Sequence, residues 1–137
     1  EFNCRLGDPE AQVILPLMET DLIDVVTSCI EGNIDKQTIR WGTESCIGVV
    51  AASGGYPDEY QEGCIIEVGD IQDDVQVFYG GTDINEDGDL VTSGGRVLTV
   101  VAKSNNLVDA SNIVYNNLKQ ITFDRMYYRN DIGIITR

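Results

Sequence analysis

SCIGVVAAS, residues 45–53, is the apolar run that decides the fold. Its length and composition predict a buried strand, and the Gly54-Gly55 pair that follows predicts a bend at its end. A second apolar run, residues 96–102, follows another glycine pair, and residues 75–79 alternate between apolar and polar. Short segments at 64–66 and 90–92 add further strand signals. These segments predict a mainly antiparallel sheet.

One amphipathic helix is predicted to pack on this sheet. Its apolar positions recur at helical spacing between residues 107 and 121, and Asn106 is placed to cap its first turn. Strands in succession followed by a single helix are typical of the α+β class. The sequence therefore predicts an α+β domain over residues 37–137.

The pattern of residues 1–36 predicts a separate segment with one strand and one helix. The helix is expected over 10–31, with Asp8 as N-cap and Pro9 in the first turn, and Gly32 follows its end. Pro16 falls inside this pattern and should kink the helix. One strand and one helix are too little for an independent core, so this piece should rest on other parts of a protein.

Charge and composition exclude several classes of partner. The 137 residues carry a formal charge of −14, which repels nucleic-acid phosphates and anionic lipid headgroups. The longest apolar runs are far shorter than the ~18 residues of a membrane-spanning helix. We therefore expect a cytoplasmic globular protein that binds neither nucleic acid nor membranes.

The four cysteines and the missing histidines limit the chemistry further. With no histidine in the chain, Ser-His-Asp and Cys-His nucleophilic schemes are unavailable. The cysteines Cys4, Cys29, Cys46 and Cys64 form no C-x-x-C pair, which argues against a zinc site. Cys29 and Cys46 lie in apolar patterns, and we expect both to be small core residues in a reducing compartment.

Residues 83–89, DINEDGD, resemble the first half of a Ca²⁺-binding loop. Oxygen-bearing side chains stand at alternate positions before Gly88, but Gly94 occupies the position where such a loop needs a bidentate glutamate. The simpler interpretation is a polar hairpin tip with Asx turns and Gly88 at positive φ. A Ca²⁺ module stays open as the less favoured alternative.

The first ten residues, EFNCRLGDPE, carry the strongest candidate site. On a strand, Glu1, Asn3 and Arg5 would share one face. Two oxygen ligands suit a Mg²⁺ ion, and a guanidinium suits the phosphate that accompanies it. The alternative is a solvated edge strand with a polar outer face.

This opening segment resembles the end of the ATP-grasp domain in the phosphoribosylamine–glycine ligase (glycinamide ribonucleotide synthetase) family. The similarity extends over most of the chain through separated motifs in the same order. These are Leu15-Pro16-Leu17, Asp21-Leu22, residues 49–57, Val77-Phe78, Leu90-Val91-Thr92, residues 94–98 and Tyr128-Arg129-x-Asp131-Ile132-Gly133.

The resemblance implies a purine-biosynthesis ligase. ATP would phosphorylate glycine, and phosphoribosylamine would attack the acyl phosphate to give glycinamide ribonucleotide, ADP and phosphate. Glu1 and Asn3 would ligate Mg²⁺ or Mn²⁺, and Arg5 would face the transferred phosphoryl group. Gly7, Asp8 and Pro9 would face the bound substrates. Residues 1–36 would then be the end of the ATP-grasp domain, and residues 37–137 the C-terminal domain.

The sequence departs from this family at Tyr79, where the family usually has histidine within Val-Phe-His-Ala-Gly-Thr. The amino-terminal domain and most of the ATP-grasp domain would be partners from the same parent chain, so we expect these 137 residues alone to be inactive. The alternative is an acidic binding module that keeps the fold without the chemistry. Its apolar face on the 10–31 helix would favour self-association.

Overall fold

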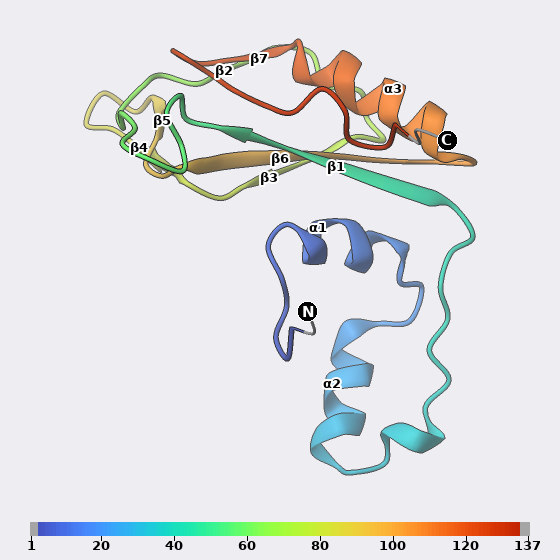
Figure 1. Cartoon of the computed structure of the whole chain (residues 1–137). Coiled ribbons are helices and arrows are strands. Elements are labelled where there is room, and N and C mark those ends of the chain that lie inside the picture. Colours follow the sequence, from blue (N-terminus) through green and yellow to red (C-terminus); the bar gives the residue numbers. More distant parts are fainter. Residues whose placement is uncertain (1–2, 135–137) are drawn as a thin grey trace.

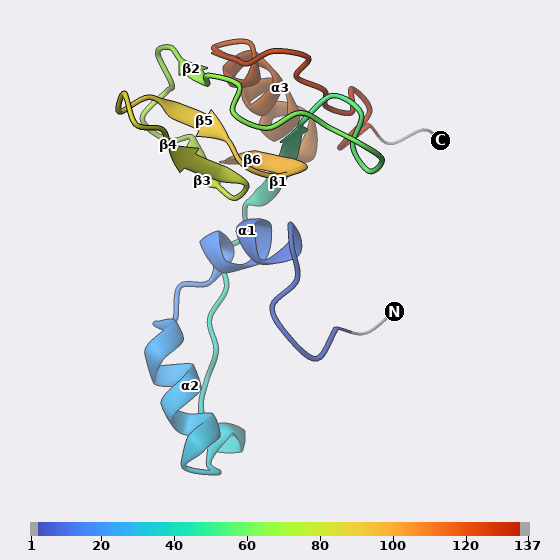
Figure 2. The same cartoon turned by 90° about the vertical axis from the view of Figure 1, so that its left-hand side faces the viewer.

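The computed structural model describes residues 3–134 of the chain. A body built from β-strands and one long helix carries a helical arm that extends away from it (Figure 1). The arm comprises the first third of the described chain, and a single extended segment returns from its far end to the first strand of the body (Figures 1 and 2).

A three-stranded antiparallel sheet forms the centre of the body. Its strands are β1 (Ser45–Ala52), β6 (Arg96–Ser104) and β3 (Gln76–Tyr79), in the order β1-β6-β3. Two small antiparallel pairs accompany it: β2 (Glu67–Val68) with β7 (Ile121–Thr122), and β4 (Thr82–Ile84) with β5 (Leu90–Thr92). The predicted antiparallel strands over 45–53, 75–79 and 96–102 are confirmed, whereas the expected strand at 64–66 contributes only a bridge between Ile65 and Val91.

Helix α3 (Leu107–Leu118) covers one face of this sheet (Figure 1). Asn106 caps it as predicted, because its side-chain oxygen accepts a hydrogen bond from the Asp109 amide at 2.9 Å. The helix ends at Leu118 rather than at Ile121, since Ile121 pairs with Val68 as a strand. The buried core lies between the sheet and α3; its apolar members include Ile47, Val49, Ala51, Leu98, Val100, Ala102, Ala110, Val114 and Leu118.

The single helix expected over 10–31 is wrong, because the structure divides this region. Helix α1 (Glu10–Ile14) runs into a 3₁₀ turn at Leu15–Leu17, and helix α2 (Leu22–Ile30) begins after a break. Proline at position 16 has no N–H for a continuous helix, and Met18 is extended and bridges to Trp41. Asp21 then starts α2 by accepting a hydrogen bond from the Ile23 amide at 2.7 Å.

The start of the arm also differs from the prediction. Residues 3–7 form no strand; the described chain places no neighbouring strand beside them, and a lone strand has no partner for its backbone groups. Pro9, not Asp8, holds the N-cap position of α1, and no side chain caps this helix. The Asp8 carboxylate is engaged elsewhere. The prediction that Asn3 and Arg5 share one face of a strand is therefore wrong.

The two arm helices have different surroundings. Helix α1 contacts β1 and β6 on the sheet face opposite α3, while α2 projects away from the body (Figure 2). Cys29 on α2 is exposed, which corrects its prediction as a core residue, because no residue of this helix is buried within the described chain. A short 3₁₀ turn at Ile34–Lys36 follows α2. No helix within residues 3–134 is long and apolar enough to span a membrane.

Candidate functional site

The loop before α1 gathers three of the residues predicted for the site. Asn3, Arg5 and Gly7 line one cavity of about 210 Å³ together with Glu10 of α1. Glu1, the other predicted metal ligand, lies outside the described residues. The structure thus keeps Asn3, Arg5 and Gly7 together through a loop instead of a strand.

Gly7 allows the tight approach between this loop and α1. A Cβ atom at this position would overlap the Glu10 carboxylate, so a larger residue would displace this flexible side chain. The Gly7 carbonyl accepts a hydrogen bond from the Ala11 amide at 3.0 Å, which joins the loop to the helix. A larger residue would push Glu10 out of the cavity.

Asp8 ties the loop to the sheet. Its Oδ2 lies 3.2 Å from Nη2 of Arg96, and its Oδ1 accepts a hydrogen bond from Nε2 of Gln12 at 2.9 Å. Nη1 of Arg96 also donates to the Asp8 carbonyl at 3.3 Å. Asp8 is therefore held by two side chains, one from α1 and one from β6.

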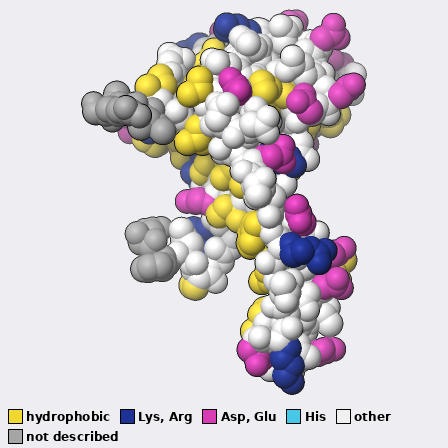
Figure 3. All heavy atoms as spheres, turned by 90° about the vertical axis from the view of Figure 1, so that its right-hand side faces the viewer, with side chains coloured by type: hydrophobic (Ala, Val, Ile, Leu, Met, Phe, Trp, Pro, Cys, Tyr) yellow, Lys and Arg dark blue, Asp and Glu magenta, His cyan; other side chains and the backbone are white. Residues whose placement is uncertain are grey.

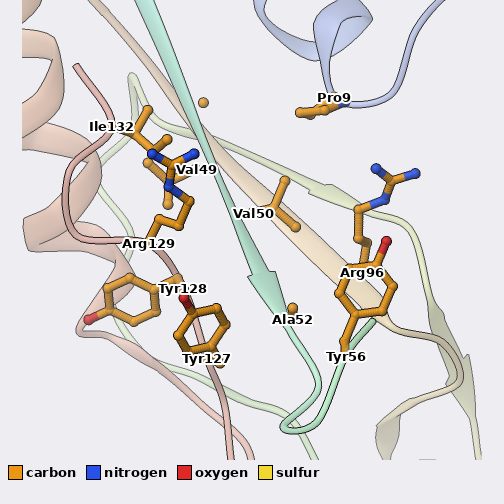
Figure 4. A pocket seen from close by; sticks show the side chains of 11 residues that line it. Pro9, Val49, Val50, Ala52, Tyr56, Arg96, Tyr127, Tyr128, Arg129 and Ile132 are labelled. Carbon is orange, nitrogen blue, oxygen red and sulfur yellow. The ribbon is translucent and has the colours of Figure 1, made fainter. Parts of the chain in front are cut away.

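Pro9 faces a different cavity, of about 220 Å³, which has a mainly apolar lining. Gly48, Val50 and Ala52 of β1 form part of it, and aromatic rings from distant segments complete it. Figure 4 shows Pro9 and Arg96 on one side of β1 and residues 127–129 on the other. The site residues predicted from the sequence are thus divided between two cavities, with Asp8 between them.

The far wall of this second cavity is fastened to the body by Tyr115. Its hydroxyl donates to the Arg129 carbonyl at 2.8 Å and accepts from the Ile132 amide at 3.0 Å. Arg129 pairs with Asp131 through two contacts of 2.9 and 2.7 Å. This hydrogen bonding lowers the pKa of the Asp131 carboxyl and raises that of the Arg129 guanidinium.

Tyr79 lies at the edge of a third cavity, of about 500 Å³, between β3 and α1. Gly7 and Gln12 also line this cavity, so Tyr79 is near the candidate loop. The ring is half exposed. The side-chain amide oxygen of Gln12, which lines the same cavity, is buried and has no hydrogen-bond partner within the described chain.

The predicted hairpin tip is confirmed in detail. Asn85 Oδ1 accepts hydrogen bonds from the amides of Asp87 and Asp89 at 3.0 and 2.8 Å, and Gly88 has a φ of 89°. Over residues 3–134, no three His, Cys, Asp or Glu side chains are grouped as a metal site would require. The turn is thus held by the Asn85 side chain.

Sequence reasoning did not include Arg96, Tyr115 or Arg129 among the site residues. Arg96 could have been suspected from the Gly94-Gly95 pair before it, since paired glycines often accompany a bulge. The role of Tyr115 depends on contacts with residues far along the chain, and no local pattern reveals it.

The fold is that of a mixed α/β module with mainly antiparallel strands, and the loop before α1 lies against its sheet. The chain superimposes with a TM-score of 0.82 on the crystal structure of phosphoribosylamine–glycine ligase from Thermotoga maritima, covering 96% of this chain and 32% of that one at 30% identity. Residues 46–134 match the family described as "Phosphoribosylglycinamide synthetase, C domain". The chain belongs to this family.

Curated relatives agree with this assignment. The chain is 45% identical to the phosphoribosylamine–glycine ligase of Vibrio parahaemolyticus, over 97% of this chain and 31% of the relative. It is 46% identical to the bifunctional purine biosynthetic protein purD of Dictyostelium discoideum, over 97% of this chain and 17% of that protein. The chain therefore spans a third or less of the relatives that it matches.

Proposed function

We propose that this chain is the C-terminal part of a phosphoribosylamine–glycine ligase. The whole enzyme would join glycine to 5-phosphoribosylamine, with ATP converted to ADP and phosphate through glycyl phosphate, and would release glycinamide ribonucleotide. The match to the Vibrio parahaemolyticus ligase over 97% of this chain is the observation that carries the proposal. We further propose that residues 1–36 end an ATP-grasp domain and that the enzyme is cytoplasmic.

The loop before α1 would contribute the chain's share of the active site. Arg5 would face the phosphoryl group in transfer, where a guanidinium stabilises developing negative charge. Gly7, Asp8 and Pro9 would face the substrates. The shared cavity of Asn3, Arg5 and Gly7 supports this assignment, because all three residues could meet one ligand.

The same loop has the right donors for Mg²⁺ or Mn²⁺. The Asn3 amide and the nearby Glu10 carboxylate offer hard oxygen atoms, and Glu1 would add a second carboxylate. Such ions take few protein ligands and complete their shell with nucleotide phosphates and water. We propose Glu1 and Asn3 as the ligands; the ion would offset phosphate charge when bound.

The remaining parts of the enzyme would hold ATP. Because the chain covers 31% of the Vibrio parahaemolyticus relative, we propose that the preceding domains supply the nucleotide site and that these 137 residues alone are inactive. Glycine, phosphoribosylamine and ATP would bind only where those domains meet the loop.

Genetic complementation tests this proposal. The C-terminal third of the Vibrio parahaemolyticus ligase is replaced by this chain, and the fusion is expressed in a bacterium that lacks its own ligase and requires purines. We expect growth without purines from the fusion and none from the chain alone. A fusion that is expressed and soluble but gives no growth, while the intact Vibrio enzyme does, would contradict the proposal.

A second candidate function is an acidic interaction module without chemistry. The exposed apolar face of α2 favours it: Ile23 is 73% and Ile30 is 81% exposed, with Leu22 and Val26 beside them. Figure 3 shows hydrophobic side chains along the region that joins the body to the arm, with charged groups at the arm's far end. Sedimentation at high concentration would reveal self-association through this face; a strict monomer would argue against this candidate.

A further inference from the structure

A β-bulge determines where Arg96 points. The pairing of β1 with β6 is regular up to Ala51 opposite Leu98, and then Ala52 lies opposite Arg96, which leaves Val97 as an extra residue on β6. Side chains of a regular strand alternate between faces, so residue 96 would otherwise share the core face of Leu98 and Val100. Val97 takes that core position instead, and Arg96 is turned to the opposite face.

That opposite face is the one on which α1 docks. Gly48 of β1 makes room there, because a Cβ atom at this position would lie 2.7 Å from Cγ1 of Val13 in α1. The bulge therefore directs a cation toward the loop that precedes α1. Bulges near functional sites commonly redirect one side chain in this way.

The backbone before Arg96 is fixed as well. Ser53 donates from its amide to the Gly95 carbonyl at 2.8 Å, and from its hydroxyl to the Gly94 carbonyl at 2.9 Å. Ser53 is almost fully buried, and the Tyr56 ring packs where a Cβ atom of Gly95 would stand. Arg96 thus extends from a rigid turn.

We propose that Arg96 is a positioning residue of the candidate site. From the sheet, its guanidinium holds both the carboxylate and the backbone carbonyl of Asp8, and so fixes the loop at Gly7 and Pro9. Figure 4 shows Arg96 on the same side of β1 as Pro9. Lysine could not reproduce this, because one ammonium lacks the two-pronged geometry that reaches both oxygens. The inference rests on the proposed function only in treating this loop as the substrate loop.

The strength of this contact should depend on salt. The side chains of Arg96 and Asp8 are 45% and 52% exposed, so mobile ions screen their attraction. A packing contact of similar size would respond little to added salt. Salt dependence therefore separates positioning by charge from a purely structural role.

Amide hydrogen exchange in the 137-residue chain, measured by NMR, tests the proposal. The reporter is the Ala11 amide, which bonds to the Gly7 carbonyl, and the Val100 amide reports on the sheet core. We expect Arg96→Gln to accelerate exchange at Ala11 about threefold and leave Val100 unchanged, as suits the loss of a partly exposed pair. Arg96→Lys should fall between the two.

Two further arms make the test specific. In an Asp8→Asn background, Arg96→Gln should have a smaller effect, because the ion pair is already lost and only the bond to the backbone carbonyl is left to remove. Added NaCl should speed Ala11 exchange in the unmodified chain but not in Arg96→Gln. The matched control is Arg40→Gln, which removes the exposed pair of Arg40 with Glu19 elsewhere in the arm and should leave Ala11 unchanged.

The proposal is overturned if Ala11 exchange is the same in folded Arg96→Gln, or if Ala11 and Val100 accelerate equally. A full effect of Arg96→Gln in the Asp8→Asn background would overturn it too. These measurements need no substrate and no ligase activity. A failure here is therefore separate from a failure of the complementation test.

Discussion

The two arm helices, α1 and α2, differ in whether the body of the molecule covers their apolar side chains. Helix α1 docks on the sheet, where Val13 fits against Gly48, and Arg96 holds the loop before it. Helix α2 carries an apolar stripe of its own, yet Ile23 and Ile30 face open solvent. An amphipathic pattern predicts that the apolar face of a helix is covered. Of the two arm helices, the body of this chain covers only α1.

The largest effect should come from the core that the body completes by itself. Leu118 of α3 is fully buried against the sheet, so Leu118→Ala should lower the free energy of unfolding by about 3 kcal/mol. Urea denaturation followed by circular dichroism measures this change. A loss below about 1 kcal/mol would show that the body is not the stable unit of the chain.

The second-largest effect on stability should come from the contact between α1 and the sheet. Gly48→Ala places a methyl group against Val13, which should cost about 1–3 kcal/mol by overpacking. Val13→Ala should restore part of the loss by making room, which a denaturation series on the three variants would show. Gly42→Ala is the matched control, because its nearest non-local atom would be 3.5 Å away. Equal losses at Gly48 and Gly42 would contradict the docking.

The reactivity of two cysteines tests the same difference between the body and α2. Burial raises the pKa of the Cys46 thiol, whereas Cys29 on α2 is exposed. Iodoacetamide at pH 8 should modify Cys29 faster than Cys46, as peptide mapping by mass spectrometry would show. Faster reaction at Cys46 than at Cys29 would contradict this expectation.

The raised pKa of the Cys46 thiol also links protein stability to pH. The stabilising contribution of the neutral Cys46 thiol is full at lower pH and declines as the pH rises through that pKa.

The smallest effect on stability should come from α2. Ile23→Ser removes an exposed apolar side chain, so the free energy of unfolding should change by less than about 0.5 kcal/mol. The same variant should reduce any self-association at high concentration, which sedimentation would measure. A large loss of stability would mean that α2 has a covering contact within the chain.

The sequence predicted the body better than the arm for a physical reason. Apolar runs such as 45–53 and 96–102 bury their own faces, and the Asn106 cap and the Asn85 turn are local hydrogen bonds. The arm was mispredicted where tertiary contacts decide. Asp8 was expected as a cap, but Arg96, distant in sequence, holds its carboxylate; Cys29 was expected in a core that α2 does not have.

The site was predicted in part. Asn3, Arg5 and Gly7 do share one cavity, although a loop and not a strand brings them together. The Gly94-Gly95 pair hints at a bulge before Arg96, but the direction of its side chain depends on one extra residue in the pairing of two strands. Glu1 lies outside the described residues, and its role stays a prediction.

Phosphate release from ATP, measured with glycine and phosphoribosylamine present, tests the central claim most directly. It should be compared between the purified chain and its fusion to the preceding two thirds of the Vibrio parahaemolyticus ligase. The account predicts no turnover by the chain alone, glycine-dependent turnover by the fusion, and a severe loss in the fusion with Asn3→Ala. Turnover by the chain alone, or a folded fusion with none, would contradict it.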